Sequence, residues 1–228
     1  MIETLDGKVA VVTGGGGGLG RALGARFARE GMRVVLADVR APALDATVAE
    51  LADAGLDVAG VVTDVASWES VAALRDRVLE AHGRVHLVCN NAGIGAGAEG
   101  RVWEHELNDW RWAMAVNVYG VIHGINAFVP VMLEHGEPGH VVNTSSGNGG
   151  IAPILATPQY SVTKAAVVTL TESRFDPVVD LPVRGGVEIT LCERHSVERA
   201  EIHSRVPGEL LRPYVHQRYD NLSPVGEE

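Results

Sequence analysis

The sequence predicts an α/β fold in which a doubly wound parallel sheet carries helices on both faces. Three observations predict it. Apolar runs of strand length alternate along the chain with longer segments of helical period. These runs are continuous in Val, Ile and Leu, as in strands that are covered on both faces. A run of five glycines, residues 14–18, follows the first strand directly, where a tight turn is required.

The beginning of the chain predicts a strand, a helix and a second strand. Residues 8–13 (KVAVVT) are an apolar run of the buried type. Residues 18–30 place apolar side chains at every fourth position from Leu19, as on one face of a helix. Residues 33–38 (RVVLAD) form the second strand. Because a helix joins the two strands, we expect them to be parallel and the crossover to be right-handed.

The same alternation continues to about residue 192. The further predicted elements are a helix over 44–54, a strand over 57–65, a helix over 67–82, a strand over 85–90, a helix over 108–134, a strand over 140–145, a helix over 159–174 and a strand over 186–192. No linker or repeat interrupts this order, so residues 1–228 are predicted to form one domain.

Composition and charge narrow the classes of partner. With 46% hydrophobic residues the chain can bury a core without disulfides, and Cys89 and Cys192 are expected to be buried free thiols. A formal net charge of −10 disfavours a nucleic-acid partner, because phosphate backbones are bound by clusters of Lys and Arg. The spacing of the histidines does not match a metal motif, so no metal site is expected.

The N-terminal segment and the apolar runs predict the location. Residues 1–10 do not show a basic segment followed by an apolar one, and no apolar stretch is expected to approach the roughly 18 residues that span a bilayer. We therefore expect a cytoplasmic protein without a membrane partner.

The glycine run has the features of a cradle for a pyrophosphate. A side chain at the turn would hold the anion away from the unpaired N–H groups at the start of the helix. Gly14, Gly18 and Gly20 fit this requirement, and Leu19 lies between the last two. A P-loop is excluded, because Gly-Lys-Ser/Thr does not follow the glycines.

Asp38 ends the second strand, where the adenosine ribose of a bound dinucleotide is expected. A carboxylate there can accept hydrogen bonds from both ribose hydroxyls and would repel a 2′-phosphate. NAD is therefore the predicted cofactor, and NADP the less favoured one. Arg40 is either a solvated surface residue or one that reaches a phosphate.

Tyr160 and Lys164 form the pair of residues that carries the predicted chemistry. Four residues apart on a helix, they share one face, with Cβ atoms about 5–6 Å apart. A phenol has a reference pKa of about 10, and a nearby ammonium stabilises the phenolate that acts as a base. The chain uses Arg almost everywhere, and its only lysines are Lys8 and Lys164. This usage favours a specific role for Lys164.

Taken together, TGGGGGLG (residues 13–20) and YSVTK (residues 160–164) resemble the motifs of the short-chain dehydrogenase/reductase family. The family pattern TGxxxGxG is met at Thr13, Gly14, Gly18 and Gly20. The resemblance implies a Rossmann-type fold and an NAD(P)-dependent oxidoreductase that transfers a hydride to or from a secondary alcohol or carbonyl. In NADP-dependent relatives a basic residue commonly precedes the second glycine, and here that residue is Gly17.

The resemblance also assigns roles to residues between the two motifs. Asp64 and Val65 resemble the pair that holds the adenine ring. Residues 90–93 (NNAG) resemble the motif after the fourth strand, which implies cofactor contacts for Asn91, Ala92 and Gly93. The resemblance further implies a catalytic group of Asn117, which helps to hold a proton-relaying water, with Ser146, Tyr160 and Lys164, the last two also contacting the cofactor. Ser145 stays open as the alternative to Ser146, because the loop before Tyr160 is one residue longer than the family usually shows.

The resemblance fails after about Leu191. The family usually continues with Pro-Gly, whereas this chain has Cys192 and Glu193. Residues 193–228 are therefore an atypical lid or tail, which we expect to add no further core strand. This departure leaves a second reading open, a dinucleotide-binding or scaffold protein with impaired catalysis.

Substrate and assembly are predicted only in outline. Residues 94–101, 147–159 and the tail are the candidate substrate pocket, in which Ile151, Ile154 and Leu155 indicate an apolar small molecule. By family habit, the helices over 108–134 and 159–174 pack against their copies, giving a homodimer or homotetramer.

Overall fold

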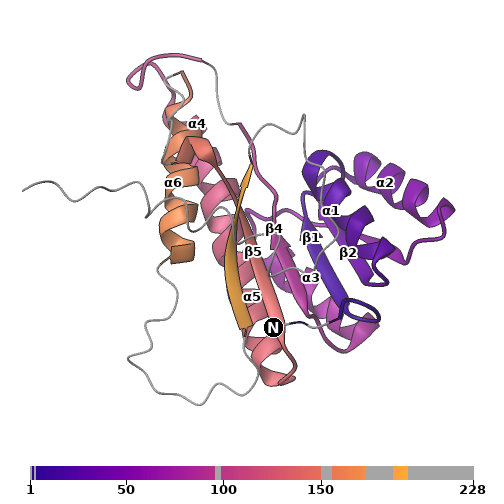
Figure 1. The fold of residues 1–228 in the computed structure, drawn as a ribbon. Helices are drawn as coiled ribbons and strands as arrows, with labels where there is room; N and C mark the ends of the chain where they lie inside the picture. The colour runs from indigo at the N-terminus through magenta and orange to yellow at the C-terminus, as the bar shows by residue number, and fades with distance from the viewer. Residues whose placement is uncertain (1, 3, 96–98, 150–155, 173–186, 195–228) are drawn as a thin grey trace, which may run out of the picture.

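The computed structural model describes residues 2, 4–95, 99–149, 156–172 and 187–194. Their elements alternate between strands and helices (Figure 1). In chain order they are β1 (Val9–Thr13), α1 (Gly18–Arg29), β2 (Arg33–Asp38), α2 (Ala41–Asp53), β3 (Val58–Val62), α3 (Trp68–His82), β4 (Leu87–Asn90), α4 (Leu107–Met114), η1 (Ala115–Tyr119), α5 (Gly120–Glu134), β5 (Gly139–Ser146), η2 (Gly147–Gly149), α6 (Pro158–Glu172) and β6 (Val187–Arg194).

The strands form one parallel sheet in the order β3-β2-β1-β4-β5-β6. β1 therefore lies in the middle, paired with β2 on one side and β4 on the other. The chain reverses its direction of travel across the sheet between β1 and β4, and in doubly wound folds ligands bind at the carboxyl ends of the strands at this point. The predicted fold class is confirmed.

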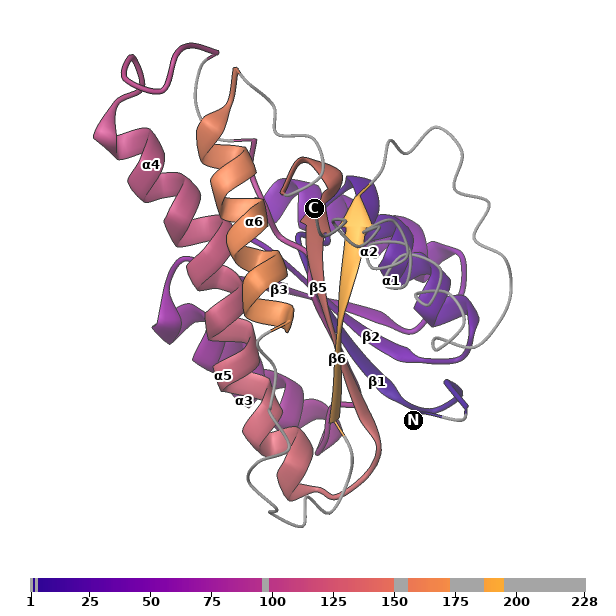
Figure 2. The same ribbon diagram turned by 60° about the vertical axis from the view of Figure 1, so that its left-hand side comes forward.

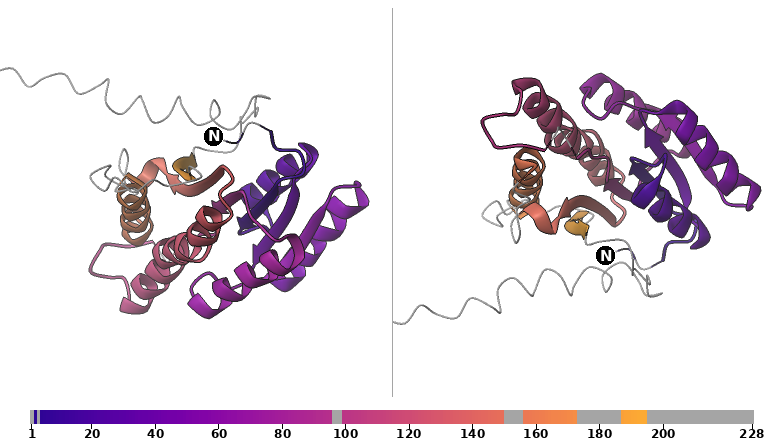
Figure 3. Two further views of the ribbon diagram at one scale, coloured as in Figure 1. Left: turned by 90° about the horizontal axis from the view of Figure 1, so that it is seen from below. Right: turned by 90° about the horizontal axis from the view of Figure 1, so that it is seen from above.

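Two apolar cores cover the two faces of the sheet. One contains side chains of β1 and β4 packed against α1 and α2. The other packs α3 and α5 against the opposite face, with Phe128 and Met132 of α5 fully buried. Figure 2 shows α3, α4, α5 and α6 on one side of the sheet and α1 and α2 on the other, and α6 lies beside α4 in the views of Figure 3.

The predicted helix over 108–134 is interrupted by a π-helical segment. α4 ends at Met114, η1 takes up Ala115–Tyr119, and α5 continues from Gly120. π-helical turns inside a helix contain one residue more than an α-helical turn and are frequent at functional sites. Asn117 lies within this segment and is fully buried.

Several element boundaries differ from the prediction. β3 ends at Val62, so Asp64 and Val65 lie in the following loop; β3 is the last strand of the sheet on its side, and its side chains are half-buried or exposed. α2 begins at Ala41 because Pro42 suits the first turn of a helix. β6 runs on through Glu193 and Arg194, so these two residues belong to the sheet and not to the tail. The rest of the predicted tail lies outside the described residues.

One of the two cysteine predictions is confirmed. Cys89 is a buried cysteine on β4 and is not part of a disulfide. Cys192 lies on β6, where the structure describes the backbone alone.

Within the part of the chain that the structure describes, the stretch Leu107–Glu134 is long and apolar enough to cross a membrane by length and composition. The expectation that no apolar stretch approaches that length is therefore wrong. Half of its most apolar window is buried inside the protein. Its buried side chains, such as Phe128 and Met132, belong to the core shared with β1 and β4. Its apolar character is thus that of a helix that packs on a sheet.

The amino-terminal ends of β1, β4 and β5 meet at a cluster of charged and imidazole groups. Glu137 accepts a hydrogen bond from Lys8 Nζ at 2.7 Å and pairs with Arg84 and His86. His86 Nδ1 accepts from the N–H of Val9 at 3.0 Å, so the ring carries its proton on Nε2 and donates it to Glu137 at 3.0 Å. We call Lys8, Arg84, His86, His135 and Glu137 the amino-end cluster.

Candidate active site

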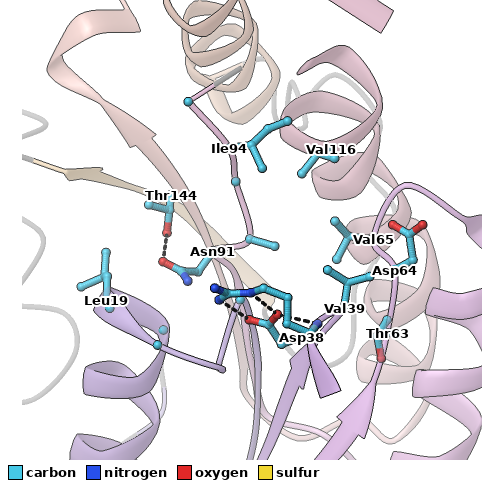
Figure 4. Close-up of a pocket in the computed structure, with 18 of the residues that line it drawn as sticks. Leu19, Asp38, Val39, Thr63, Asp64, Val65, Asn91, Ile94, Val116 and Thr144 are labelled. Atoms are coloured by element: carbon cyan, nitrogen blue, oxygen red, sulfur yellow. Dashed lines mark hydrogen bonds and ion pairs between the residues drawn. The ribbon is translucent and has the colours of Figure 1, made fainter. Parts of the chain in front are cut away.

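A cavity of about 710 Å³ opens at the carboxyl ends of the strands (Figure 4). It lies where the order of the strands reverses, between β1 and β4. Its walls come from the turns after β1, β2, β3 and β4, from α4 and η1, from β5 and from α6. The lining residues are Gly14, Gly17, Gly18, Leu19, Gly20, Asp38, Val39, Arg40, Thr63, Asp64, Val65, Asn91, Ala92, Gly93, Ile94, Gly95, Trp112, Val116, Thr144, Ser145, Tyr160 and Lys164.

The glycine run forms one wall of this cavity. Gly14 and Gly18 have φ of +71° and +53°, which L side chains rarely adopt. A Cβ on Gly20 would lie 2.1 Å from the carbonyl oxygen of Gly14, so only glycine fits there. α1 begins at Gly18, and the N–H groups of its first turn have no partner within the helix. The turn therefore fits a pyrophosphate.

The turn after β4 is tied to β1 by Thr13. Its hydroxyl accepts hydrogen bonds from the N–H groups of Asn91 and Ala92, both at 3.0 Å, and donates to the carbonyl of Cys89. Asn91 in turn donates from Nδ2 to the carbonyl of Thr13 at 2.9 Å. These bonds hold the NNAG turn beside the glycine run.

Asp38 lies at the floor of the cavity and is almost fully buried. Its Oδ2 accepts from the N–H of Gly16 at 2.9 Å, and its Oδ1 accepts from the N–H and the Nε of Arg40 at 3.0 and 3.2 Å. Burial by itself would raise the pKa of Asp38, but the hydrogen bonds from Arg40 and Gly16 outweigh it and lower this pKa. Arg40 is therefore a surface residue with an exposed side chain that also pairs with Asp38.

Asp64 and Val65 line the cavity from the loop after β3. Asp64 fixes this loop, because its Oδ1 accepts from the N–H of Ala66 at 2.9 Å. The carbonyl of Val65 accepts a hydrogen bond from Nδ1 of His123 at 2.9 Å. A Cβ on Gly120 would lie 2.9 Å from Val65 Cγ2, so α5 approaches this loop closely.

Tyr160 and Lys164 extend from α6 into the same cavity. The Nζ atom of Lys164 lies 5.8 Å from the centre of the Tyr160 ring and donates to the carbonyl of Thr144 at 2.9 Å. A Cβ on Gly93 would lie 3.3 Å from this Nζ and 3.2 Å from Asn117 Oδ1. The ammonium is thus held between β5, α6 and the NNAG turn, beside the phenol.

Asn117 links the turn after β4 to α6. Its Oδ1 accepts from the N–H of Ile94 at 2.8 Å, and its Nδ2 donates to the carbonyl of Ile94 and to Thr163 Oγ1, both at 3.0 Å. Thr163 Oγ1 donates to the carbonyl of Tyr160 at 2.9 Å. The buried amide thereby positions Tyr160 through two hydrogen bonds.

The two candidate serines differ in their partners. Ser145 Oγ donates to the carbonyl of Lys164 at 2.9 Å, so its proton is used within the protein. Ser146 Oγ accepts from the N–H of Asn148 at 3.3 Å. Ser145, and not Ser146, is among the residues that line the cavity. The hydrogen bonds thus favour Ser146 as the donor to a substrate, because the Ser145 proton is already donated to Lys164. The position in the cavity wall favours Ser145 instead.

The structure adds lining residues that the sequence analysis missed. These are Val39, Thr63, Trp112, Val116 and Thr144. Trp112 lies four positions before Val116, hence on the same face of the helix, and this spacing next to Asn117 is a signal that could have found both. The predicted apolar residues Ile151, Ile154 and Leu155 lie outside the described residues.

The chain is similar to known proteins in sequence and in fold. The sequence model described as short chain dehydrogenase matches residues 8–203, which extends past Leu191, where the resemblance was expected to fail. Among curated proteins, C alpha-dehydrogenase of Sphingobium sp. is 38% identical over 171 residues, 75% of this chain and 55% of that protein. The chain thus spans little more than half of this relative.

Solved structures of similar fold bind either dinucleotide. A short chain dehydrogenase/reductase from Burkholderia phymatum in complex with NAD is 40% identical, with a TM-score of 0.77, over 99% of this chain and 83% of that one. A metagenomic short-chain oxidoreductase in complex with NADP is 30% identical, with a TM-score of 0.75, over 85% of this chain and 84% of that one.

Proposed function

Because the chain belongs to the short-chain dehydrogenase/reductase family, we propose that it is an NAD-dependent oxidoreductase that interconverts a secondary alcohol and a carbonyl compound. The observation that carries this proposal is the shared cavity. Gly14, Gly18 and Gly20 form a cradle at one end, and Tyr160 and Lys164 lie in the same cavity. When bound, the nicotinamide supplies the carbon that accepts or returns the hydride.

The residues of this chain move the proton and orient the substrate. Tyr160 takes the hydroxyl proton of the alcohol as the hydride leaves the substrate carbon, and it returns a proton to the carbonyl oxygen in the reverse direction. Lys164 stabilises the phenolate with its ammonium, which the carbonyl of Thr144 holds in place. Ser146 donates to the substrate oxygen. Asn117 positions Tyr160 through Thr163.

Tyr160→Phe tests this function. The variant keeps the ring and removes the hydroxyl, so we expect turnover to fall about 10²- to 10⁴-fold while dinucleotide binding persists. The measurement is steady-state kinetics with NAD and NADP over a panel of secondary alcohols, beside a titration of each dinucleotide. Tyr119→Phe is the matched control, because Tyr119 is exposed on η1 and does not line the cavity. Near wild-type turnover in Tyr160→Phe would exclude Tyr160 as the proton donor.

The proposed preference for NAD rests on two residues that line the cavity, Asp38 and Gly17. The Asp38 carboxylate presents two acceptors for ribose hydroxyls and a charge that repels a 2′-phosphate. Gly17 stands where NADP-dependent relatives commonly carry a basic residue. The relative from Burkholderia phymatum, solved with NAD, supports the same choice.

The described walls favour an apolar substrate. Ile94, Trp112 and Val116 line the cavity from the turn after β4 and from the helix α4-η1. Trp112 is 53% exposed, although it is large and apolar. A substrate that packs on this side chain would bury apolar surface and gain binding free energy. We therefore propose an apolar small-molecule alcohol or carbonyl compound.

A second function is a dinucleotide-binding protein with impaired catalysis. The observation that favours it is that β6 continues as a strand through Glu193 and Arg194, paired with Ser145 and Ser146, where the family usually has Pro-Gly. If this alternative holds, NAD binds and the panel of alcohols shows no turnover. Turnover that depends on Tyr160 excludes it.

We further propose that each chain forms one domain and that the protein is a homodimer or homotetramer. Large apolar side chains outside the cavity are exposed on and before α4, on η1 and on α6, on the sheet face opposite α1 and α2; they are Trp103, Leu107, Tyr119 and Val162. A second copy would cover such a surface. Light scattering after size-exclusion chromatography measures the state. The cytoplasmic location stays a prediction from the sequence.

A further inference from the structure

The carboxylate of Asp38 already has partners in the free protein. It is 5% exposed and accepts four hydrogen bonds. Two come from the backbone N–H groups of Gly16 and Arg40, at 2.9 and 3.0 Å. The other two come from the guanidinium of Arg40, from Nε at 3.2 Å and from Nη2 at 3.4 Å (Figure 4).

The backbone N–H donors and the guanidinium donors differ in how easily they can move away from Asp38. The backbone bonds fix the turn after β1 and the start of α2, so they persist whatever the cavity holds. The guanidinium bonds are the longer pair, and the Arg40 side chain is 65% exposed at the cavity wall. Ion pairs with an exposed partner are weak, so this side chain can move away at little cost.

We propose that Arg40 is a displaceable occupant of the ribose-binding carboxylate and that it narrows the preference for NAD over NADP. This inference rests on the proposed function. Binding of NAD requires the ribose hydroxyls to replace the guanidinium on Asp38, so Arg40 competes with NAD. Binding of NADP brings a 2′-phosphate to the same place, where the guanidinium neutralises Asp38 and donates to the phosphate.

The charges at this place support the two opposite effects. Hydrogen bonding and the charge of Asp38 raise the pKa of the Arg40 guanidinium, which is therefore a permanent cation. Guanidinium N–H groups match phosphate oxygens in geometry, and such bonds are among the stronger ones in proteins. Without this cation, the buried carboxylate and a 2′-phosphate would repel each other. Arg40 thus weakens the binding of NAD and strengthens the binding of NADP.

Removing the Arg40 side chain leaves the local backbone intact. Arg40 caps α2 without a side-chain hydrogen bond, and Pro42 supports the first turn of the helix. The N–H of Arg40 still donates to Asp38 in Arg40→Ala. The matched control is Arg75→Ala, which removes an equal charge from an arginine that pairs with Asp76 on α3, away from the cavity.

The test is titration of NAD and of NADP into the wild-type protein and both variants, with thermal unfolding as a check of the fold. We expect Arg40→Ala to bind NAD about 2- to 5-fold more tightly, because an exposed ion pair no longer competes. We expect it to bind NADP at least about 10-fold more weakly, because charged hydrogen bonds are lost. Arg75→Ala should leave both affinities at the wild-type value.

A double-mutant cycle tests whether Arg40 acts through Asp38. In the Asp38→Ala background, Arg40→Ala should give no gain in NAD affinity. A gain that persists there, weaker NAD binding in Arg40→Ala, or an unchanged ratio of the two affinities would each overturn the inference and leave the proposed function standing. A wild-type protein that binds neither dinucleotide would overturn both.

Discussion

The charged groups at the two ends of the sheet differ in what they contact. At the amino-terminal end, Glu137 is half-buried and pairs with three cationic or imidazole partners, Lys8, Arg84 and His86. At the carboxyl end, Lys164 is bonded to a backbone carbonyl and faces a cavity. At the first end a single carboxylate is shared by Lys8, Arg84 and His86, none of which lines the cavity. At the second end the charged groups, Lys164 and the Asp38–Arg40 pair, line the cavity, where a ligand can reach them.

The comparison shows how one sheet separates stability from function. Parallel strands bring all their carboxyl ends to one edge, where the turns vary and bind ligands, and all their amino ends to the other. At the carboxyl edge several positioning groups are backbone atoms, as in the two bonds between Asn117 and the backbone of Ile94 and the bond from the N–H of Gly16 to Asp38. Such bonds fix a side chain without neutralising it. Variants at the two edges should therefore have different effects.

The largest expected effect is at the carboxyl end. Lys164→Ala removes the ammonium beside Tyr160, so turnover should fall about 10²- to 10⁴-fold. The same ammonium is predicted to contact the cofactor, so the dinucleotide should bind more weakly as well. Turnover of the variant and titration with NAD check both losses. The control is Lys8→Ala in the amino-end cluster, which removes the other lysine and should leave turnover unchanged; an equal loss in both would remove the distinction between the ends.

The serine pair gives the next effect and decides between Ser146 and Ser145. If Ser146 donates to the substrate oxygen, Ser146→Ala should lower turnover about 10²-fold, as the loss of one such donor does. Ser145→Ala breaks a bond to the Lys164 carbonyl and should mainly lower the free energy of unfolding, by about 1 kcal/mol. Kinetics and urea unfolding of both variants separate the roles. The reverse pattern would assign the catalytic hydroxyl to Ser145.

The third effect is confined to the amino-terminal end. Glu137→Gln removes the acceptor charge shared by Lys8, Arg84 and His86, so the free energy of unfolding should fall by about 1–2 kcal/mol. Turnover should stay at the wild-type value. Glu50→Gln, which breaks an exposed pair with Arg21, is the control and should cost less. A loss of turnover in Glu137→Gln would show that the two ends are coupled.

The sequence predicted the sheet well because the strands are locally encoded. Continuous apolar runs specify strands buried on both faces, and the glycine run specifies the turn after β1. The predicted end of β3 was wrong because the residues of this strand are partly exposed and their apolar pattern is weak. The π-helical segment around Asn117 could not be predicted, since it accompanies a hydrogen bond to Ile94 in a distant turn.

In the candidate site, too, the sequence predicted some features and not others. Gly14 and Lys164 were assigned to the site from the glycine run and the Tyr160–Lys164 pair, and Asn91 from the family resemblance; these three residues line the cavity. The partner of Arg40 was not predicted, although it lies only two residues away, because an arginine side chain can point to solvent or to a neighbour from the same backbone. The choice between Ser145 and Ser146 depends on contacts with α6 and η2, which sequence spacing does not give.

The smallest expected effect is the pH dependence of the amino-end cluster. Burial lowers the pKa of His86, and the charges of Lys8 and His135 add to this, whereas the hydrogen bond and the charge of Glu137 oppose it. Protonating Nδ1 would also break the bond from the N–H of Val9. Because the folded pKa lies below the unfolded value of about 6.5, this contribution to stability is complete above that pH and is lost as the pH falls through the folded pKa.

Glu137 adds a second, more acidic window to the same prediction. Its hydrogen bonds with Lys8 and His86 lower its pKa from 4.5 to about 2, so its contribution is complete above pH 4.5 and is lost as the pH falls toward 2. His86→Gln keeps an acceptor and a donor but does not titrate, so the free energy of unfolding should fall less between about pH 7 and 5 than in the wild type. Urea unfolding across this range measures the slope. The control is His105→Gln, which replaces a histidine outside the amino-end cluster. Equal slopes for His86→Gln and the wild type would show that the amino-end cluster does not sense pH.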